Sequence, residues 1–200
     1  MYHTSAPWPI GPAPQRERRK APRTPLVFTL AKLITNGREW PCMVRNLSAS
    51  GMQIQLPVPP LVNAVVTVEM QGMAPKQARV RWAKGRIAGL LFDTPCSVDE
   101  VLAGRRNLAG SPRFRLDRAA TLNLEDGPVS VLALEISIDE VRLAASQPLG
   151  AGCPASLDLG LVGLSARGTI GARVGDSYQF FFDKPWASVT LAQLLQGARD

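Results

Sequence analysis

Short runs of β-branched and other apolar residues, separated by turn residues, fill the first half of the chain. Asn36-Gly37, Ser50-Gly51 and Lys84-Gly85 mark turns between the runs, and prolines at 57–60 mark another. Six strands at hairpin spacing are typical of a small antiparallel β-barrel. The predicted strands cover residues 26–33, 40–47, 52–56, 64–70, 78–83 and 87–92.

A short helix is predicted after the sixth strand. Ser97 and Glu100 have the spacing of a capping box, and apolar residues around Val101 give the helix one hydrophobic face up to about residue 108. Residues 109–112, which read AGSP, predict a linker because Gly and Pro end a helix and favour a turn.

The second half of the chain resembles the first. Three segments align in the same order, and a second apolar helix is predicted from about Ser188, with leucines on one face. An unrelated second β domain is the alternative, but the constant order of the segments favours duplication. The aligned pairs are 23–30 with 115–122, 46–59 with 135–148, and 92–95 with 182–185.

These patterns predict a mainly β protein of two tandem six-stranded antiparallel barrels, each followed by a short C-terminal helix. Residues 1–15 are rich in proline and have little to pack, so we expect a disordered arm. The first domain then spans 16–108, the linker 109–112 and the second domain 113–200.

The two halves of the chain also differ in net charge. The net charge is +7 and the sequence pI about 9.9. Residues 1–110 hold 15 Lys and Arg against 6 Asp and Glu, whereas residues 111–200 hold 8 against 10. An excess of positive charge concentrates phosphates of any kind, so the first half is expected to bind an anion.

Several classes of function are disfavoured by composition. The three cysteines are far apart and have no CxxC spacing, which argues against a disulfide framework and a zinc site. His3 is the only histidine, and no nucleophile, Walker or metalloprotease motif is present, so we expect no enzyme and no cofactor. No apolar run is long enough to span a membrane, so we expect a cytoplasmic protein without membrane insertion.

Basic residues in front of the first strand form the first candidate motif. Pro22 and Pro25 prevent a helix here, so Arg19 and Arg23 belong to an extended segment. We call residues 18–23 the arginine strap. An Arg side chain binds a guanine edge bidentately, stacks on a purine or grips phosphate oxygens. A solvated basic tail is the alternative interpretation of this run.

The second motif is the polar turn N-L-S-A-S-G at residues 46–51, which we call the NxSxxG turn. Asn46 offers two donors and an acceptor to a base edge, and Ser48 offers a hydroxyl to a phosphate. Gly51 lacks the Cβ that would block a close approach. Taken alone, this pattern is common in ordinary turns.

Together, the two motifs make the chain resemble PilZ-domain proteins, the bacterial receptors of cyclic di-GMP, over residues 16–108. The family motifs RxxxR and (D/N)xSxxG are complete here as residues 19–23 and 46–51. The resemblance implies that cyclic di-GMP is clamped between strap and turn. The implied ligand-binding residues are Arg18, Arg19, Arg23, Asn46, Ser48 and Gly51.

Two further expectations follow from the resemblance. A basic residue directly before RxxxR tends to accompany a stacked pair of ligand molecules in this family, and Arg18 has that position. Ligand binding is expected to order the strap and to pass a signal to an unidentified downstream protein.

The second copy departs from the pattern at the motif positions. In the alignment, Ser111 replaces Arg19 and only Arg115 remains of the strap. Glu135, Ser137 and Glu140 replace Asn46, Ser48 and Gly51. Two carboxylates would repel the phosphates, so this copy is expected not to bind the nucleotide. It would instead serve packing, homo-oligomerisation or partner contact.

Two alternative functions remain open from the sequence. One is a basic barrel that binds single-stranded nucleic acid, with Trp40, Trp82 or Phe28 as stacking platforms. Nucleic acid is the less favoured partner, because strand aromatics more often belong to the core. The other is a ligand-free scaffold, which is disfavoured because both motifs are complete.

Overall fold

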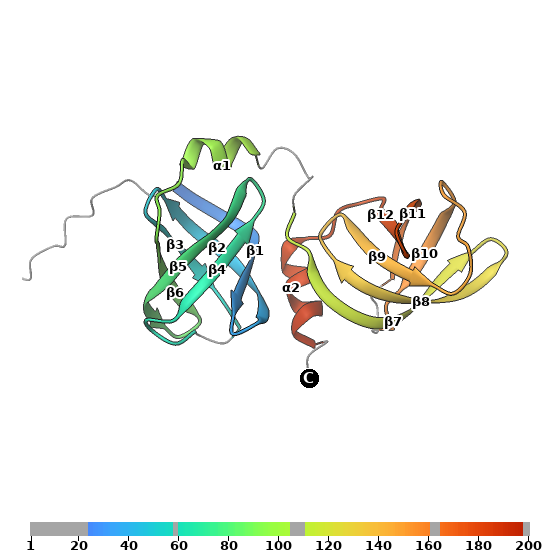
Figure 1. The fold of residues 1–200 in the computed structure, drawn as a ribbon, viewed down its shortest axis with the longest axis horizontal. Coiled ribbons are helices and arrows are strands. Elements are labelled where there is room, and N and C mark those ends of the chain that lie inside the picture. Colours follow the sequence, from blue (N-terminus) through green and yellow to red (C-terminus); the bar gives the residue numbers. More distant parts are fainter. Residues whose placement is uncertain (1–23, 58–59, 105–110, 161–164, 198–200) are drawn as a thin grey trace, which may run out of the picture.

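Two closed β-barrels, each followed by one short helix, make up the described part of the chain (Figure 1). The predicted mainly β fold with two tandem six-stranded barrels is therefore confirmed. The N-terminal arm and Arg18, Arg19 and Arg23 of the strap lie outside the described residues. The structure is a computed structural model and describes residues 24–57, 60–104, 111–160 and 165–197.

The first barrel closes through antiparallel neighbours in the order β1-β2-β3-β6-β5-β4, with β4 pairing back to β1. Asn36 and Gly37 join β1 to β2 with φ of 50° and 70°, the left-handed conformation that a two-residue hairpin needs. Its elements are β1 (Thr24–Thr35), β2 (Arg38–Ser48), β3 (Gly51–Gln55), β4 (Val65–Met70), β5 (Met73–Lys84), β6 (Ile87–Phe92) and α1 (Val98–Gly104).

Most boundaries lie close to the prediction, with one clear difference. β5 begins at Met73 instead of residue 78, because Gly72 with φ of 80° closes a tight turn directly after β4. Half of the predicted capping box is present, since the backbone N of Glu100 donates to Ser97 Oγ at 3.3 Å.

Alternating side chains from all six strands fill the first barrel. The strands supply mainly aliphatic residues that are almost fully buried, and Val101 of α1 adds one more. Burial of this apolar surface is the main stabilising contribution to such a barrel. The interior includes Ala31, Leu33, Val44, Leu47, Ile54, Val66, Val68, Ala78, Val80 and Ala88.

The second barrel has the same connectivity, with β7 in the place of β1 and each later strand in the corresponding place. This shared ring order is what the predicted duplication requires. Its elements are β7 (Phe114–Leu124), β8 (Gly127–Ile136), β9 (Glu140–Ala145), β10 (Pro154–Asp158), β11 (Ser165–Val174), β12 (Ser177–Phe182) and α2 (Ser188–Gly197).

Strand register corrects one part of the sequence alignment. Thr24 pairs with Leu47 in the first barrel, and Phe114 pairs with Ile136 in the second. The residue before Thr24, which is Arg23, therefore corresponds to Arg113, and the predicted match with Arg115 is wrong. The irregularities in β1 and β7 skip different numbers of residues, which a gapless alignment could not detect.

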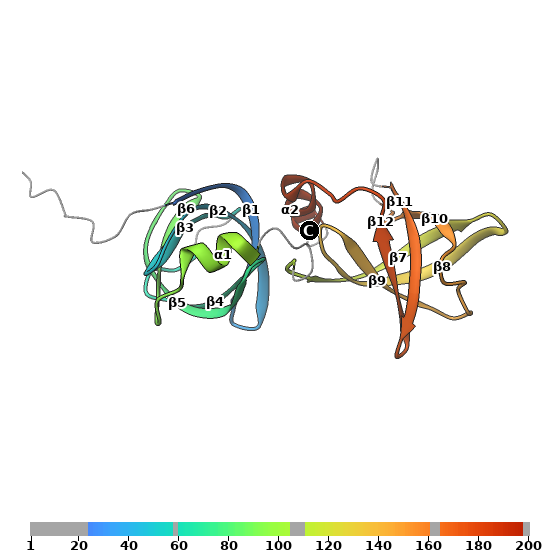
Figure 2. The same ribbon diagram turned by 90° about the horizontal axis from the view of Figure 1, so that it is seen from above.

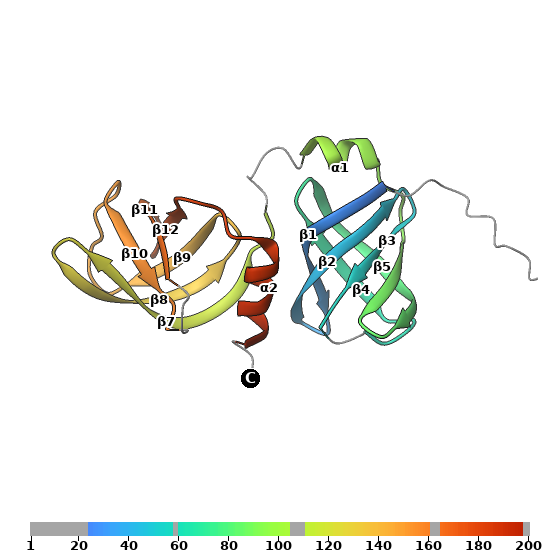
Figure 3. The same cartoon turned by 180° about the vertical axis from the view of Figure 1, so that it is seen from behind.

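Helix α2 lies between the two barrels, as the three ribbon views show (Figures 1, 2 and 3). Its buried Leu191, Leu194 and Leu195 belong to the core of the second barrel. Leu30 on β1 of the first barrel is 3% exposed and belongs to that same core, and Met43 on β2 packs against it. The two barrels therefore share one hydrophobic cluster.

A partly buried charge network centred on Lys32 also joins the two barrels. Lys32 Nζ is 3.1 Å from Glu39 and 2.9 Å from Glu69, and donates to the Arg113 carbonyl at 3.0 Å. Glu39 also accepts a hydrogen bond from the backbone N of Arg115 at 3.0 Å. Burial alone would lower the pKa of Lys32, but the two carboxylates outweigh it and raise the pKa.

The raised pKa fixes the pH range in which this network stabilises the fold. A cation whose pKa is higher in the folded state contributes its stabilisation below its ordinary pKa, here 10.5, and loses it as the pH rises through the folded value. Lys32 therefore remains charged and stabilising at neutral pH.

Replacing Leu30 tests the shared core. We expect Leu30→Ala to lower the free energy of unfolding by about 2–5 kcal/mol, because it removes a buried side chain from the core cluster that both barrels share. Urea denaturation followed by circular dichroism measures this. Leu91→Ala is the control, since Leu91 is 43% exposed and its loss should cost less than about 1 kcal/mol. Equal effects of the two substitutions would contradict the shared core.

Candidate ligand-binding site

The pairing of β1 with β2 brings the ends of the two sequence motifs together. Thr24 pairs with Leu47 and Pro25 with Asn46. Arg23 directly precedes Thr24 in the sequence, so the end of the arginine strap is one peptide bond away from a residue that pairs inside the NxSxxG turn. Strap positions 18, 19 and 23 are not described, whereas Asn46, Ser48 and Gly51 are.

Hydrogen bonds hold the NxSxxG turn in place. Ser48 Oγ donates to the Gly51 carbonyl at 3.1 Å and so closes the turn. The carbonyls of Ala49 and Ser50 accept bonds from Cys96 N at 2.8 Å and Phe92 N at 2.9 Å. The turn is therefore pinned to the end of β6 and to the connection that follows it.

Gly51 is required by the packing of the barrel itself. A Cβ on this buried residue would lie 2.1 Å from the Leu90 carbonyl oxygen, which belongs to the backbone of β6. Its φ is not in the left-handed region. From the sequence, Gly51 is expected to let a ligand approach closely. The structure adds a second reason for a glycine here, which is the close approach of β3 to β6.

Asn46 is half-buried and has a partner that the sequence did not reveal. Its Nδ2 donates to Gln53 Oε1 at 2.6 Å across the β2–β3 pair. Gln53 therefore fixes the side-chain position of Asn46 before any ligand arrives. The signal was the hairpin register, because counting outward from the Ser48–Gly51 pair places residue 53 near residue 46.

The equivalent turn in the second barrel has the same backbone and different charges. Ser137 Oγ donates to Asp139 Oδ1 at 2.7 Å and lies 3.3 Å from the Glu140 carbonyl, the counterpart of the Gly51 carbonyl to which Ser48 donates. The Glu140 carboxylate forms an ion pair with Arg113, the residue that corresponds to Arg23. The Glu140 side chain is only 10% exposed, so it occupies the interior of this site.

The second barrel also differs at the two positions that correspond to Asn46 and Gln53. Glu135 and Arg142 face each other there and form an ion pair at 3.3 Å. Both carboxylates that the sequence placed at the second site are thus paired with arginines of the same barrel. Internal ion pairs fill the polar sites at which the first barrel has Asn46 and Gly51.

The aromatic residues considered as stacking platforms have structural contacts. The indole of Trp82 covers Gly89 on the neighbouring strand, and a Cβ on Gly89 would lie 2.1 Å from its Nε1. Trp40 is half-buried and packs against the first core. The side chain of Phe28 lies outside the described residues.

Two of the cysteines lie in environments that keep their thiols neutral. Burial raises the pKa of Cys42 to about 12. Burial also raises the pKa of Cys96, against an opposing effect of the Lys76 charge. Among the described residues, no three His, Cys, Asp or Glu side chains are grouped to hold a metal. None of the helices in the described ranges is both long and apolar enough to cross a bilayer.

A closed six-stranded barrel with an NxSxxG turn, preceded in the sequence by a basic strap and followed by a short helix, defines the class of the first unit. Residues 17–103 match the family model of the PilZ domain. The chain therefore carries a PilZ domain, formed by the first barrel, and the matched range includes both motifs.

No curated protein matches the sequence. Similar solved structures include the PlzA protein of Borreliella burgdorferi in complex with c-di-GMP, with 8% identity, 83% of this chain and 86% of that chain covered, and a TM-score of 0.39. Two others are the K. pneumonia MrkH–c-di-GMP complex (14% identity, 86% and 89% covered, TM-score 0.34) and Escherichia coli YcgR in complex with c-di-GMP (13%, 84% and 80%, 0.31). Likeness at this level carries no argument about the ligand of this chain.

The packing role of Gly51 is testable without ligand. We expect Gly51→Ala to lower the free energy of unfolding by about 1–3 kcal/mol, because the new Cβ overlaps the Leu90 carbonyl. Chemical denaturation measures the loss. Ser50→Ala is the matched control, since Ser50 is exposed and contributes its backbone carbonyl, which the substitution keeps. A Gly51→Ala variant as stable as the wild type would contradict the close approach of β3 and β6.

Proposed function

We propose that the first barrel is a receptor for cyclic di-GMP, which it binds between the arginine strap and the NxSxxG turn. The observation that carries the proposal is the β1–β2 register, which joins the end of the strap to the turn within the matched PilZ domain. The positive charge of the first half of the chain suits a ligand with two phosphates.

Each proposed ligand contact follows from the chemistry of its side chain. Arg19 and Arg23 supply planar forks for phosphate oxygens and a guanine edge. Asn46, held by Gln53, supplies an amide for the second base edge. Ser48 supports the site mainly through the turn, because its hydroxyl already donates to the Gly51 carbonyl. Backbone N–H groups of the turn then remain the candidates for phosphate contact.

The second barrel supports the receptor without binding the nucleotide itself. Glu140 and Arg113 neutralise each other where the first barrel has a glycine and a strap arginine. A ligand phosphate would have to displace a buried carboxylate from its arginine, which costs free energy on both sides. We propose that this barrel instead provides a fixed support for β1 and β2 through Leu30, Met43 and helix α2.

Signal transfer would use the same two strands. β1 and β2 carry the turn at one end and the contact with the second barrel further along. A ligand that orders the strap against the turn therefore changes the surface that the first barrel and its N-terminal residues present to a downstream protein.

Isothermal titration calorimetry with cyclic di-GMP tests the binding site. We expect Arg19→Ala and Arg23→Ala each to weaken binding about 10- to 100-fold, because each removes charge-assisted hydrogen bonds of about 1.5–3 kcal/mol. Ser48→Ala is expected to have a smaller effect on affinity and to destabilise the turn. Arg81→Ala is the matched control, since it removes the same charge from an exposed position on β5.

Three results would separate the alternatives. Wild-type affinity in both strap variants would overturn the proposed site. An equal loss in Arg81→Ala would indicate general electrostatic attraction instead of a clamp. A steep fall of affinity with salt, together with tighter binding of single-stranded nucleic acid, would favour the nucleic-acid alternative.

The number of ligands per chain tests the role of Arg18. We expect two cyclic di-GMP molecules per wild-type chain and one per Arg18→Ala chain, because the additional arginine can pair the second molecule of a stacked dimer. The same titrations report this stoichiometry. A wild-type ratio of one would contradict the ligand dimer while leaving the receptor proposal intact.

A further inference from the structure

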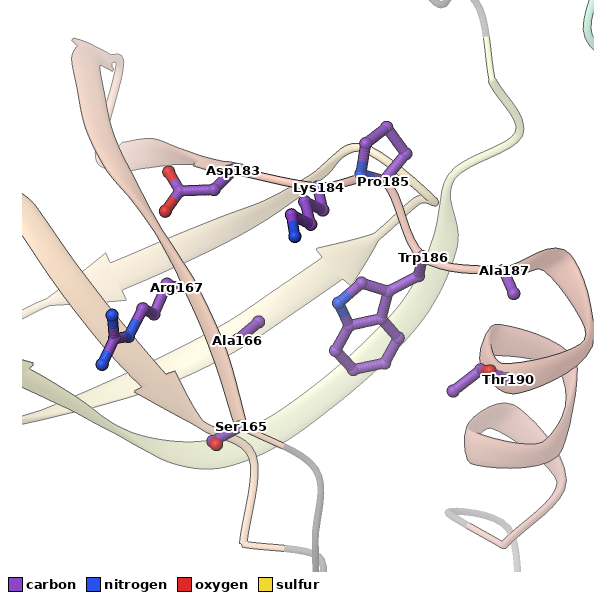
Figure 4. Close-up of a pocket in the computed structure, with 9 residues that line it drawn as sticks. All are labelled: Ser165, Ala166, Arg167, Asp183, Lys184, Pro185, Trp186, Ala187 and Thr190. Atoms are coloured by element: carbon purple, nitrogen blue, oxygen red, sulfur yellow. The ribbon is translucent and has the colours of Figure 1, made fainter.

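An open cavity in the second barrel lies between the start of β11 and the connection from β12 to α2 (Figure 4). Its volume is about 620 Å³, within the usual range for small-molecule sites. The counterparts of the first-barrel motif, Glu135, Ser137 and Glu140, do not line it. The lining residues are Ser165, Ala166, Arg167, Asp183, Lys184, Pro185, Trp186, Ala187 and Thr190.

In the first barrel a lysine takes up the corresponding space. The backbone bonds Asp93 N to Gln77 O and Asp183 N to Arg167 O are equivalent, so Lys76 corresponds to Ala166. Lys76 Nζ reaches the β6–α1 connection and donates to Thr94 Oγ1 at 3.0 Å and to the Pro95 carbonyl at 3.2 Å.

Alanine removes this bridge in the second barrel. The methyl group of Ala166 is too short to cross the space. Lys184 stands at the position that corresponds to Thr94. The position of Cys96 is taken by Trp186, whose backbone N bonds the turn as Cys96 does. The two copies thus have equivalent backbone hydrogen bonds here, and in the second copy Trp186 lines an open cavity.

The side chains around the cavity suit an anion with a flat ring. Arg167 and Lys184 are exposed, and neither side chain forms a hydrogen bond or ion pair with a described residue. Asp183 is the one carboxylate among the lining residues, so the two cations leave a net positive charge. Trp186 is half-buried and stacks on Phe182, with ring centroids 5.3 Å apart and planes at 17°.

The place of the cavity beside α2 adds to its preference for anions. Thr190 lies in the first turn of α2, and in Figure 4 the Trp186 ring lies between this turn and Arg167. A helix N-terminus carries a partial positive charge and unpaired N–H groups, which favour a negative group nearby. An occupant would contact the helix that packs between the barrels.

We propose that this cavity is a second binding site, which takes a small organic anion with a planar ring. The ring lies against Trp186, and the anionic group lies between Arg167 and Lys184. Aromatic stacking and charge-assisted hydrogen bonds act together in this arrangement. The site is independent of cyclic di-GMP binding by the first barrel.

Adenosine monophosphate is a suitable probe, because it combines a flat ring with a phosphate. NMR titration of the full chain follows the Trp186 indole N–H signal, which the Trp186→Phe variant assigns. We expect a saturable shift with adenosine monophosphate and at least about tenfold weaker binding of adenosine or inorganic phosphate alone, because each fragment lacks one of the two contacts. No shift with adenosine monophosphate would overturn the proposal.

Two variants place first-barrel residues in the cavity and test whether the probe binds there. Ala166→Lys restores the bridging lysine and should abolish the shift by filling the cavity. Arg167→Gln with Lys184→Thr introduces the residues at 77 and 94, leaves the space open and should weaken binding at least about tenfold. An unchanged shift in either variant would show that the probe binds elsewhere and would overturn the proposal. Titration with cyclic di-GMP should be unaffected by both variants.

Discussion

The antiparallel pairing of β1 with β2 is the interaction on which the site and the arrangement of the two barrels depend. One end of the pair carries Asn46 and Ser48, and the strap directly precedes it in the sequence. Its middle carries Leu30 and Met43, which pack into the core of the second barrel. Further along, Lys32 and Glu39 connect to the backbone of residues 113 and 115. A single hairpin thus joins ligand chemistry to interdomain packing.

The two barrels show how one backbone can carry different chemistry. Their ring order and the backbone hydrogen bonds of their turns agree, yet Gly51 corresponds to Glu140 and Lys76 to Ala166. The first exchange fills a polar site with an internal ion pair. The second empties a space that a lysine occupies in the other copy. Side-chain replacement has therefore placed an ion pair at one position and left a cavity at the other.

The sequence predicted the strands, the two barrels and the helices because period-two alternation and turn residues act locally. It also predicted that the second site carries carboxylates. It could not predict Arg113 as the partner of Glu140, because the irregular pairing in β7 changes the register without a signal in composition. The contact of Gln53 with Asn46 follows from the cross-strand register, which was not worked out from the sequence. The burial of Lys32 was not predicted either, because lysine is rarely buried in proteins. The cavity beside Trp186 could be recognised only by comparing the two barrels in space.

Leu30 also has a consequence for dividing the chain into separate barrels. A gene fragment that encodes only residues up to the linker would leave this leucine facing water, and the second barrel would lose part of its interior. Cutting the chain at the linker would therefore expose apolar surface on both barrels. A truncated gene product would thus be prone to aggregate, even though each barrel closes its own ring of strands.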